Sequence, residues 1–176
     1  MRGFEVKYRA DDTLINGMIE LDNLVYNGDD VGVEDKCKEW LNVNPDIYTI
    51  LMCGDKVVGY INFMPLKDEA YDLIKLGKLK DCQLTTKHLM EFKTGETLKC
   101  LLTSIVIHPN YQMGSAIAWL WRGFISKLQA LNLNIESVIM DCVTDIGERC
   151  AVKYLDAKFI TNSKGGKIYE GRIKYL

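Results

Sequence analysis

A strand, a glycine-containing turn and a long helix follow one another in residues 101–131, LLTSIVIHPNYQMGSAIAWLWRGFISKLQAL. The apolar run Leu101–Ile107 ends at His108-Pro109, and the small residues 114–116 (Gly-Ser-Ala) come just before the helical pattern. The first turn of a helix has backbone N–H groups without intrahelical partners, and its dipole favours an anion. The segment therefore predicts a binding site for a phosphate or pyrophosphate.

Cysteine and histidine are not spaced for metal binding. The six cysteines form no C-x-x-C pair and the two histidines, His88 and His108, are far apart, so no metal site is predicted. Cys142, near the end of a predicted strand, is one candidate nucleophile, but no histidine follows it in the sequence. A buried thiol is the simpler interpretation. The N-terminus has no signal-peptide pattern, so free thiols in a reducing cytoplasm are expected.

The composition is that of an ordinary globular protein. The 176 residues are 48% hydrophobic and 26% charged, which predicts one domain over residues 1–176 with a substantial core. The net charge of -2 and a pI of about 5.7 give no reason to expect a nucleic-acid partner. No apolar run is long enough to span a membrane, so no membrane partner is expected either.

Periodicity and turn residues predict the secondary structure. The predicted elements in the first part of the chain are strand 4–8, helix 12–25, turn 27–30, helix 34–41, strand 47–53, a tight turn at 54–55 and strand 56–65. A helical insert at about 66–97 follows, with helices at 69–76 and over 86–92. The remaining elements are strand 99–107, helix 114–131, strand 137–143, helix 145–156 and a closing hairpin of strands 158–162 and 167–176.

These elements predict an α/β (α+β) fold with a single mixed, mostly antiparallel sheet and helices on both faces. The hairpins make antiparallel pairs. Strands 99–107 and 137–143 are joined by a helix and should be parallel. Gly59 within strand 56–65 predicts a bulge or the close approach of another backbone.

This element order, together with two motifs, resembles the GNAT family of acyl-CoA-dependent N-acetyltransferases. The first motif is Ile107–Gln112 (IHPNYQ), which resembles the family's strand end and lead-in to a Gln/Arg-x-x-Gly-x-Gly/Ala turn. Counting from Gln112 places Ser115 and Ile117 at the glycine positions. Counting back from the helix places Gly114 and Ala116 there, which we prefer because Ile117 would crowd a phosphate.

The second motif is residues 147–159, GERCAVKYLDAKF. It resembles the family's Asn-x-x-Ala-x-x-x-Tyr-x-x-x-Gly-Phe pattern. Tyr154 falls on the family's tyrosine and Phe159 on its phenylalanine, while Gly147, Cys150 and Lys158 replace the asparagine, alanine and glycine.

The resemblance implies a GNAT-like fold in which the central parallel strands splay apart, and direct transfer of an acetyl group from acetyl-CoA to an amine in a ternary complex. The backbones of Ile105 and Ile107 would pair with the pantetheine arm and polarise the thioester. Tyr154 would protonate the leaving thiolate. The pyrophosphate would be bound by Gln112, Met113, Gly114, Ser115 and Ala116.

The general base and the acceptor are left open by the sequence. Many relatives have a glutamate on the strand matching Lys99–Ile107, which here reads KCLLTSIVI and has no carboxylate. Thr103 or Ser104 could order a water without being a base. Alternatives for the base are His88, Glu91 and Glu96 in the insert, or water itself.

The expected acceptor is a small-molecule amine or a protein amino group, and a homodimer is left open. Two alternative functions also remain: a non-catalytic acyl-CoA-binding sensor, and a protein-interaction domain on a GNAT-like fold. The missing strand carboxylate and the altered glycine turn favour the sensor over an enzyme to some degree.

Overall fold

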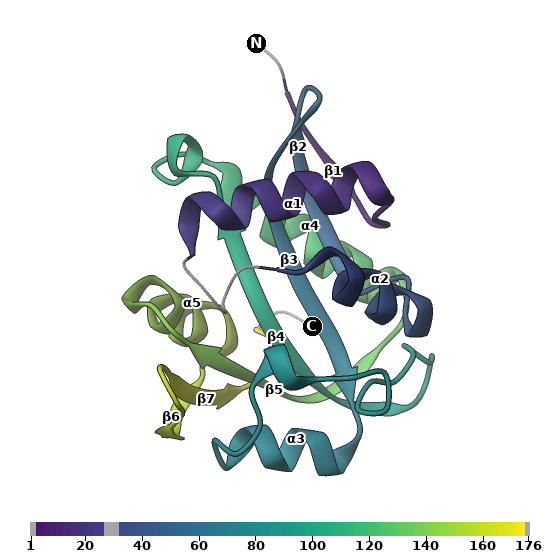
Figure 1. Cartoon of the computed structure of the whole chain (residues 1–176), viewed down its shortest axis with the longest axis vertical. Helices are drawn as coiled ribbons and strands as arrows, with labels where there is room; N and C mark the ends of the chain where they lie inside the picture. The colour runs from purple at the N-terminus through teal and green to yellow at the C-terminus, as the bar shows by residue number, and fades with distance from the viewer. Residues whose placement is uncertain (1–2, 27–31, 175–176) are drawn as a thin grey trace. The chain divides into compact units, whose positions relative to one another are not determined.

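The computed structural model describes residues 3–26 and 32–174. Its strands form one seven-stranded sheet in the order β1-β2-β3-β4-β5-β7-β6 (Figure 1). The strands are β1 (Phe4–Lys7), β2 (Tyr48–Cys53), β3 (Lys56–Leu66), β4 (Thr97–Ile107), β5 (Asn134–Cys142), β6 (Lys158–Asn162) and β7 (Lys167–Gly171). The helices are α1 (Asp12–Val25), α2 (Glu34–Val43), α3 (Asp68–Lys75), α4 (Ala116–Ala130) and α5 (Asp145–Leu155), with short 3₁₀ turns η2 (Asp81–Gln83) and η3 (Pro109–Tyr111).

The chain divides into two compact units. The first unit comprises Met1–Asn62 and Ser104–Ala130, and the second comprises Phe63–Thr103 and Leu131–Leu176. Strands β3 and β4 therefore contribute residues to both units. The phosphate-type turn belongs to the first unit, whereas α5 with Tyr154 belongs to the second.

A bulge in β3 sets the two faces of the sheet in the first unit. β2 and β3 pair antiparallel with Leu51 opposite Gly59 and Met52 opposite Val57, so Val58 is an extra residue in the register. The extra residue places Val57 and Gly59 on opposite faces. A Cβ added at Gly17 of α1 would lie 2.7 Å from Val57 Cγ2, whereas one at Gly59 would lie 3.5 Å from Leu120 of α4.

Helix α1 covers one face of this unit, and α4 covers the other (Figure 1). The Asp11 carboxylate caps α1 by accepting from the Leu14 N–H at 2.8 Å. Helix α4 packs closely because Gly123 has no side chain: a Cβ there would be 2.8 Å from Val6 of β1. The buried Lys127 ammonium of α4 donates to the carbonyls of Tyr8 and Tyr48, at 3.1 and 2.7 Å.

The second unit contains the predicted parallel pair. β4 and β5 are parallel from Thr97↔Asn134 to Leu101↔Ile139, and β5 then pairs antiparallel with β7. Helices α3 and α5 lie on opposite faces of β7, because successive residues of a strand point to opposite sides. Glu170 of β7 accepts from Tyr71 of α3 at 2.8 Å, while Tyr169 donates to Glu148 of α5 at 2.7 Å.

The sequence-based fold is confirmed in its element order, its mixed sheet and its parallel strand pair. The helix predicted over 86–92 is wrong. The Thr85 N–H donates to the His88 ring and the His88 N–H to the Thr85 carbonyl, which makes a local turn. Leu89 then forms a bridge with Leu66.

The closing strand is also shorter than predicted. β7 ends at Gly171, after which Arg172 and Lys174 donate their N–H groups to the carbonyls of Leu155 and Tyr154, at 2.7 and 3.2 Å. Residues 172–174 therefore bond to the end of α5 instead of extending the sheet. The turn predicted at 27–30 lies outside the described residues.

The close approach predicted at Gly59 is confirmed and gives a test of stability. A Cβ there would be 2.9 Å from the Val106 carbonyl oxygen of β4 and 2.6 Å from Ile107 Cδ1. Because backbone cannot yield as a side chain can, Gly59→Ala is expected to lower the free energy of unfolding by about 1–3 kcal/mol. Urea denaturation measures the change. Gly3→Ala is the control, because a Cβ at Gly3 meets nothing within 4 Å. An equal effect of the two substitutions would show that the strands can separate freely at Gly59.

Candidate functional site

The predicted anion-binding turn lies in the first unit, where β4 is connected to α4 through η3. Two of the predicted pyrophosphate residues donate their N–H groups within the turn: Gln112 to the Pro109 carbonyl at 3.3 Å and Gly114 to the Tyr111 carbonyl at 3.2 Å. The Trp119 N–H donates to the Ser115 carbonyl at 3.0 Å, which makes Ser115 the residue that precedes the first turn of α4. The N–H groups that a helix start leaves for an anion are therefore those of residues 115–118.

The small residues before α4 leave the turn open. Met113 is fully exposed, and a Cβ at Gly114 would meet only the Tyr111 carbonyl oxygen, at an ordinary contact distance of 3.6 Å. Ala116, the first residue of α4, is buried. Of the five predicted pyrophosphate residues, Gln112 and Gly114 have N–H groups used within the turn, while Ser115 and Ala116 begin the helix.

The end of β4 turns backbone groups toward the edge away from β3. The His108 N–H donates to the Val58 carbonyl of β3 at 2.9 Å. Because N–H and C=O groups alternate between the two edges of a strand, those of Ile105 and Ile107 point to the opposite edge. The Gln112 side-chain amide donates to the Ile107 carbonyl at 3.1 Å, which connects the turn to that edge. The described register of β4 with β5 ends at Leu101↔Ile139 and includes neither Ile105 nor Ile107.

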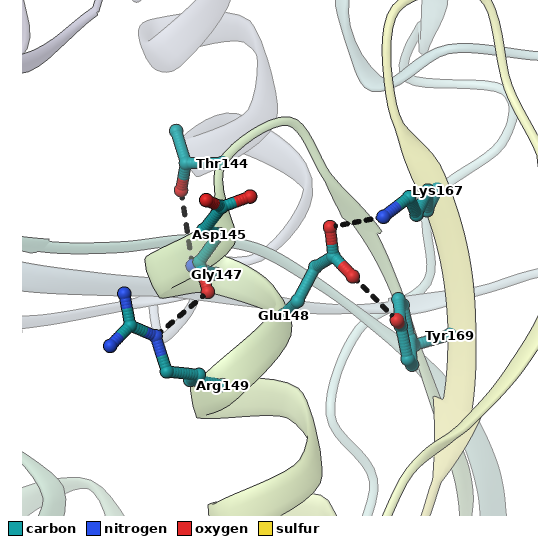
Figure 2. Close-up of polar contacts among 7 residues, drawn as sticks. All are labelled: Thr144, Asp145, Gly147, Glu148, Arg149, Lys167 and Tyr169. Carbon is teal, nitrogen blue, oxygen red and sulfur yellow. Dashed lines mark hydrogen bonds and ion pairs between the residues drawn. The ribbon is translucent and has the colours of Figure 1, made fainter.

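Helix α5 of the second unit is fixed at its start by polar contacts (Figure 2). The Thr144 hydroxyl accepts from the Gly147 N–H at 3.0 Å, which caps the helix. Glu148 accepts from Lys167 and from Tyr169, each at 2.7 Å, which attaches the first turns of the helix to β7. These two hydrogen bonds lower the pKa of Glu148, and the carboxylate in turn raises the pKa values of Lys167 and Tyr169.

Tyr154 lies in the last turn of α5 and is half-buried. The Lys153 ammonium lies 5.0 Å from the centre of the Tyr154 ring. The Tyr154 carbonyl accepts from the Lys174 N–H, and Asp156 caps the helix in the left-handed conformation with a φ of 51°. The Tyr154 backbone is therefore part of the hydrogen bonding that closes the end of α5.

The Cys142 thiol is buried at the end of β5. Burial, with Asp141 and Glu148 as further causes, raises the pKa of Cys142 to about 12. A thiol with that pKa is almost entirely protonated at neutral pH and is a poor nucleophile. This geometry supports the interpretation of Cys142 as a packing residue.

A buried carboxylate in the first unit was not singled out by the sequence. Asp22 of α1 is only 4% exposed, and its oxygens accept from the Tyr60 hydroxyl at 2.6 Å and from the Gly32 N–H at 2.9 Å. Burial raises the pKa of Asp22, while the two hydrogen bonds lower it. The only signal in the sequence was an aspartate at a position otherwise apolar in the helical pattern, next to Leu21 and four residues after Met18.

The described parts of the chain contain neither a membrane-spanning helix nor a group of side chains suited to hold a metal ion. None of the helices within residues 3–26 and 32–174 is long and apolar enough to cross a membrane. Within the same residues, no three His, Cys, Asp or Glu side chains are grouped so as to hold a metal ion.

Comparison with known proteins identifies similar folds but no similar sequences. No family model and no curated protein matches the sequence. The GphF GNAT-like decarboxylase in complex with isobutyryl-CoA aligns with a TM-score of 0.67 at 13% identity, over 97% of this chain and 100% of that chain. The loading GNATL domain of CurA from Lyngbya majuscula gives 0.65 at 13%, over 99% and 100%.

A third solved structure, the PaiA N-acetyltransferase from Thermoplasma acidophilum in complex with coenzyme A, gives a TM-score of 0.61 at 10% identity, over 97% of this chain and 99% of that chain. At such identities, the likeness establishes the arrangement of helices and strands. The chemistry has to be argued from the residues of this chain.

The raised pKa of Cys142 predicts its behaviour toward an alkylating reagent. At pH 8, a thiol with a pKa of about 12 is ionised to only about one part in 10⁴, so iodoacetamide should label the exposed Cys82 and leave Cys142 unlabelled. Mass spectrometry of the digested protein measures each site, and the unfolded chain is the control in which both should be labelled. Rapid labelling of Cys142 in the folded protein would instead support a nucleophilic thiol.

Proposed function

We propose that this chain, which has the GNAT fold, is an N-acetyltransferase that transfers the acetyl group of acetyl-CoA to a primary amine of a small molecule or a protein. The amine attacks the thioester directly while both substrates are bound. The observation that carries this proposal is the turn from β4 into α4. It offers backbone N–H groups at a helix start, beside a strand edge whose backbone groups point away from β3.

The turn suits the pyrophosphate of acetyl-CoA. Ser115 and Ala116 would bind one phosphate through their N–H groups, assisted by the dipole of the 15-residue helix α4. Gln112, Met113 and Gly114 would line the approach, where the absence of a side chain on Gly114 leaves space. The N–H groups of Gln112 and Gly114 would have to leave their bonds to the carbonyls of Pro109 and Tyr111 before they could bind a phosphate.

The edge of β4 suits the pantetheine arm. Ile105 and Ile107 would bind its amides through their backbones, and a backbone N–H there would polarise the thioester carbonyl. Tyr154 would donate a proton to the thiolate as the C–S bond breaks, with its position maintained by the bonds at the end of α5. Alignment of amine and thioester would supply a large part of the rate acceleration.

Substitutions at Gly114 test the cofactor site by calorimetric titration with acetyl-CoA. Gly114→Glu places a carboxylate beside the pyrophosphate and should weaken binding by about tenfold or more, about 1.4 kcal/mol. Gly114→Gln is the matched control of equal size without charge, and its smaller effect isolates the electrostatic part. Desulfo-CoA, titrated in parallel, should bind similarly because it keeps the pyrophosphate. Equal affinities of both variants and the parent would place the pyrophosphate elsewhere.

Removal of the Tyr154 hydroxyl tests the chemical step. Tyr154→Phe should lower kcat for amine acetylation by about 10²-fold because the thiolate loses its acid, with the affinity for acetyl-CoA nearly unchanged. Tyr8→Phe is the control, since Tyr8 is partly exposed and its described hydrogen bond is made by its backbone carbonyl. Chromatography of acetyl-CoA and CoA follows turnover without a thiol reagent, which Cys82 would consume.

The outcome for the parent chain separates the functional classes. Acetyl-CoA binding with acetylation of spermidine, a lysine derivative or a tripeptide amine supports the transferase. Binding without any turnover favours an acyl-CoA-binding sensor. No binding by the folded protein leaves a protein-interaction domain on the GNAT fold.

A further inference from the structure

The proposed acetyl transfer lacks a group that removes a proton from the amine. A primary amine is protonated near neutral pH and has to lose that proton before it can attack a thioester. None of the 11 residues of β4 is a carboxylate. A base must therefore lie on another element or be reached through intervening groups.

Three side chains of the first unit form a continuous hydrogen-bonded chain that ends on a carboxylate. Ser104 of β4 hydrogen-bonds to Tyr60 of β3, and the Tyr60 hydroxyl donates to Asp22 of α1 at 2.6 Å. A tyrosine hydroxyl has one proton. Because Tyr60 uses that proton toward Asp22, Ser104 must be the donor in the bond that it shares with Tyr60. We call these three residues the hydroxyl relay.

The exposure of the three residues gives the relay an outer and an inner end. Ser104 is half-buried, and it precedes Ile105, one of the backbones proposed to bind the pantetheine arm. Tyr60 and Asp22 are both 4% exposed. The serine oxygen keeps lone pairs for a further donor when its own proton points to Tyr60. The relay thus connects a half-buried oxygen on β4 to a carboxylate in the interior.

We propose that the hydroxyl relay removes the proton from the acceptor amine, with Ser104 in contact with the substrate and Asp22 as the final proton acceptor. Tyr60 and Asp22 act through Ser104 and are positioning residues. This inference rests on the proposed N-acetyltransferase function and names the missing base of that same reaction.

The proton transfers balance without another reactant. The ammonium gives a proton to the Ser104 oxygen as the serine proton moves to Tyr60 and the Tyr60 proton moves to Asp22. The neutral amine then attacks the thioester carbon, Tyr154 gives its proton to the thiolate of CoA as the C–S bond breaks, and the second proton lost by the nitrogen restores the Tyr154 hydroxyl. After the product leaves, Asp22 returns its proton to solvent through the same two hydroxyls.

The surroundings of Asp22 suit this role. Within residues 3–26 and 32–174, the titratable groups that interact with Asp22 are Tyr60 of β3, Tyr48 of β2 and Cys37 of α2, and burial raises the pKa of each of them, so all three are neutral at ordinary pH. Burial likewise raises the pKa of Asp22, which makes it a stronger base than a carboxylate in water. Tyr60 does not need to ionise, because it receives one proton as it gives up another.

The decisive variant is Ser104→Ala, because it interrupts the relay at its outer end and leaves the bond between Tyr60 and Asp22 intact. Initial rates of spermidine acetylation are measured from pH 7 to pH 10 by chromatography of CoA. We expect kcat to fall by about 10²-fold at pH 7 and the deficit to shrink toward parity at pH 10, where the amine loses its proton unaided. The KM for acetyl-CoA should not change.

Three further variants separate the relay from a structural role. Ser104→Thr keeps the hydroxyl and should retain most of the activity. Thr49→Val removes a buried hydroxyl from β2 on the other face of the sheet, because Thr49 lies between Tyr48 and Ile50 and Ile50 is paired with Tyr60. Its activity should equal that of the parent. Asp22→Asn should reproduce the pH-dependent deficit, with urea denaturation used to confirm that it is folded.

Each outcome decides the proposal. An unchanged kcat in Ser104→Ala, or a deficit of the same size at pH 7 and pH 10, overturns the relay while the transferase function stands. If the parent binds acetyl-CoA but acetylates no amine in the panel, the transferase proposal itself fails and the relay fails with it. The activity of the parent chain therefore tells the two failures apart.

Discussion

The bulge at Val58 of β3 is the constraint on which the first unit depends. One extra residue reverses the alternation of the strand, so that Gly59 faces α4 and Tyr60 faces α1. Gly59 then lets the end of β4 approach closely, at Val106 and Ile107, just before the turn into α4. The same reversal directs the Tyr60 hydroxyl to Asp22. Without the bulge, Tyr60 would point toward α4, and its hydroxyl would not connect the end of β4 to the Asp22 carboxylate.

Local signals in the sequence were sufficient to predict most of the elements. Helix α1 was predicted with its bounds because Leu14, Met18, Leu21 and Val25 recur near helical spacing, and in the structure the Asp11 carboxylate caps its start. The prediction of a second helix in the insert was wrong because the His88 ring accepts a hydrogen bond from the Thr85 N–H, and hydropathy does not report such local competition with a helix. The closing strand was predicted too long for a related reason: the N–H groups that follow it have carbonyl partners on α5 rather than in the sheet.

The candidate site was predictable only where neighbours in sequence are neighbours in space. The turn into α4 is continuous in the chain, so its position followed from a proline and three small residues. The hydrogen bonds that the N–H groups of Gln112 and Gly114 donate to carbonyls of η3 could not be predicted, because they depend on the dihedral angles of a few residues. The bond between Asp22 and Tyr60 joins residues 38 apart, and no periodicity connects them. Whether Tyr154 serves as the acid stays a prediction.

A buried carboxylate lowers stability unless donors offset the loss of water. Asp22 has two donors, Tyr60 and Gly32. Their hydrogen bonds offset part of the cost of burying the carboxylate, but they do not return its pKa to the usual value. Replacing a buried hydrogen-bonded pair by apolar side chains of similar shape can be nearly neutral or stabilising. Packing alone therefore does not require an acid at this position, whereas the proposed proton transfer does. The same burial that costs stability increases the proton affinity of Asp22, and two hydroxyls supply the connection to a strand that has no acid of its own.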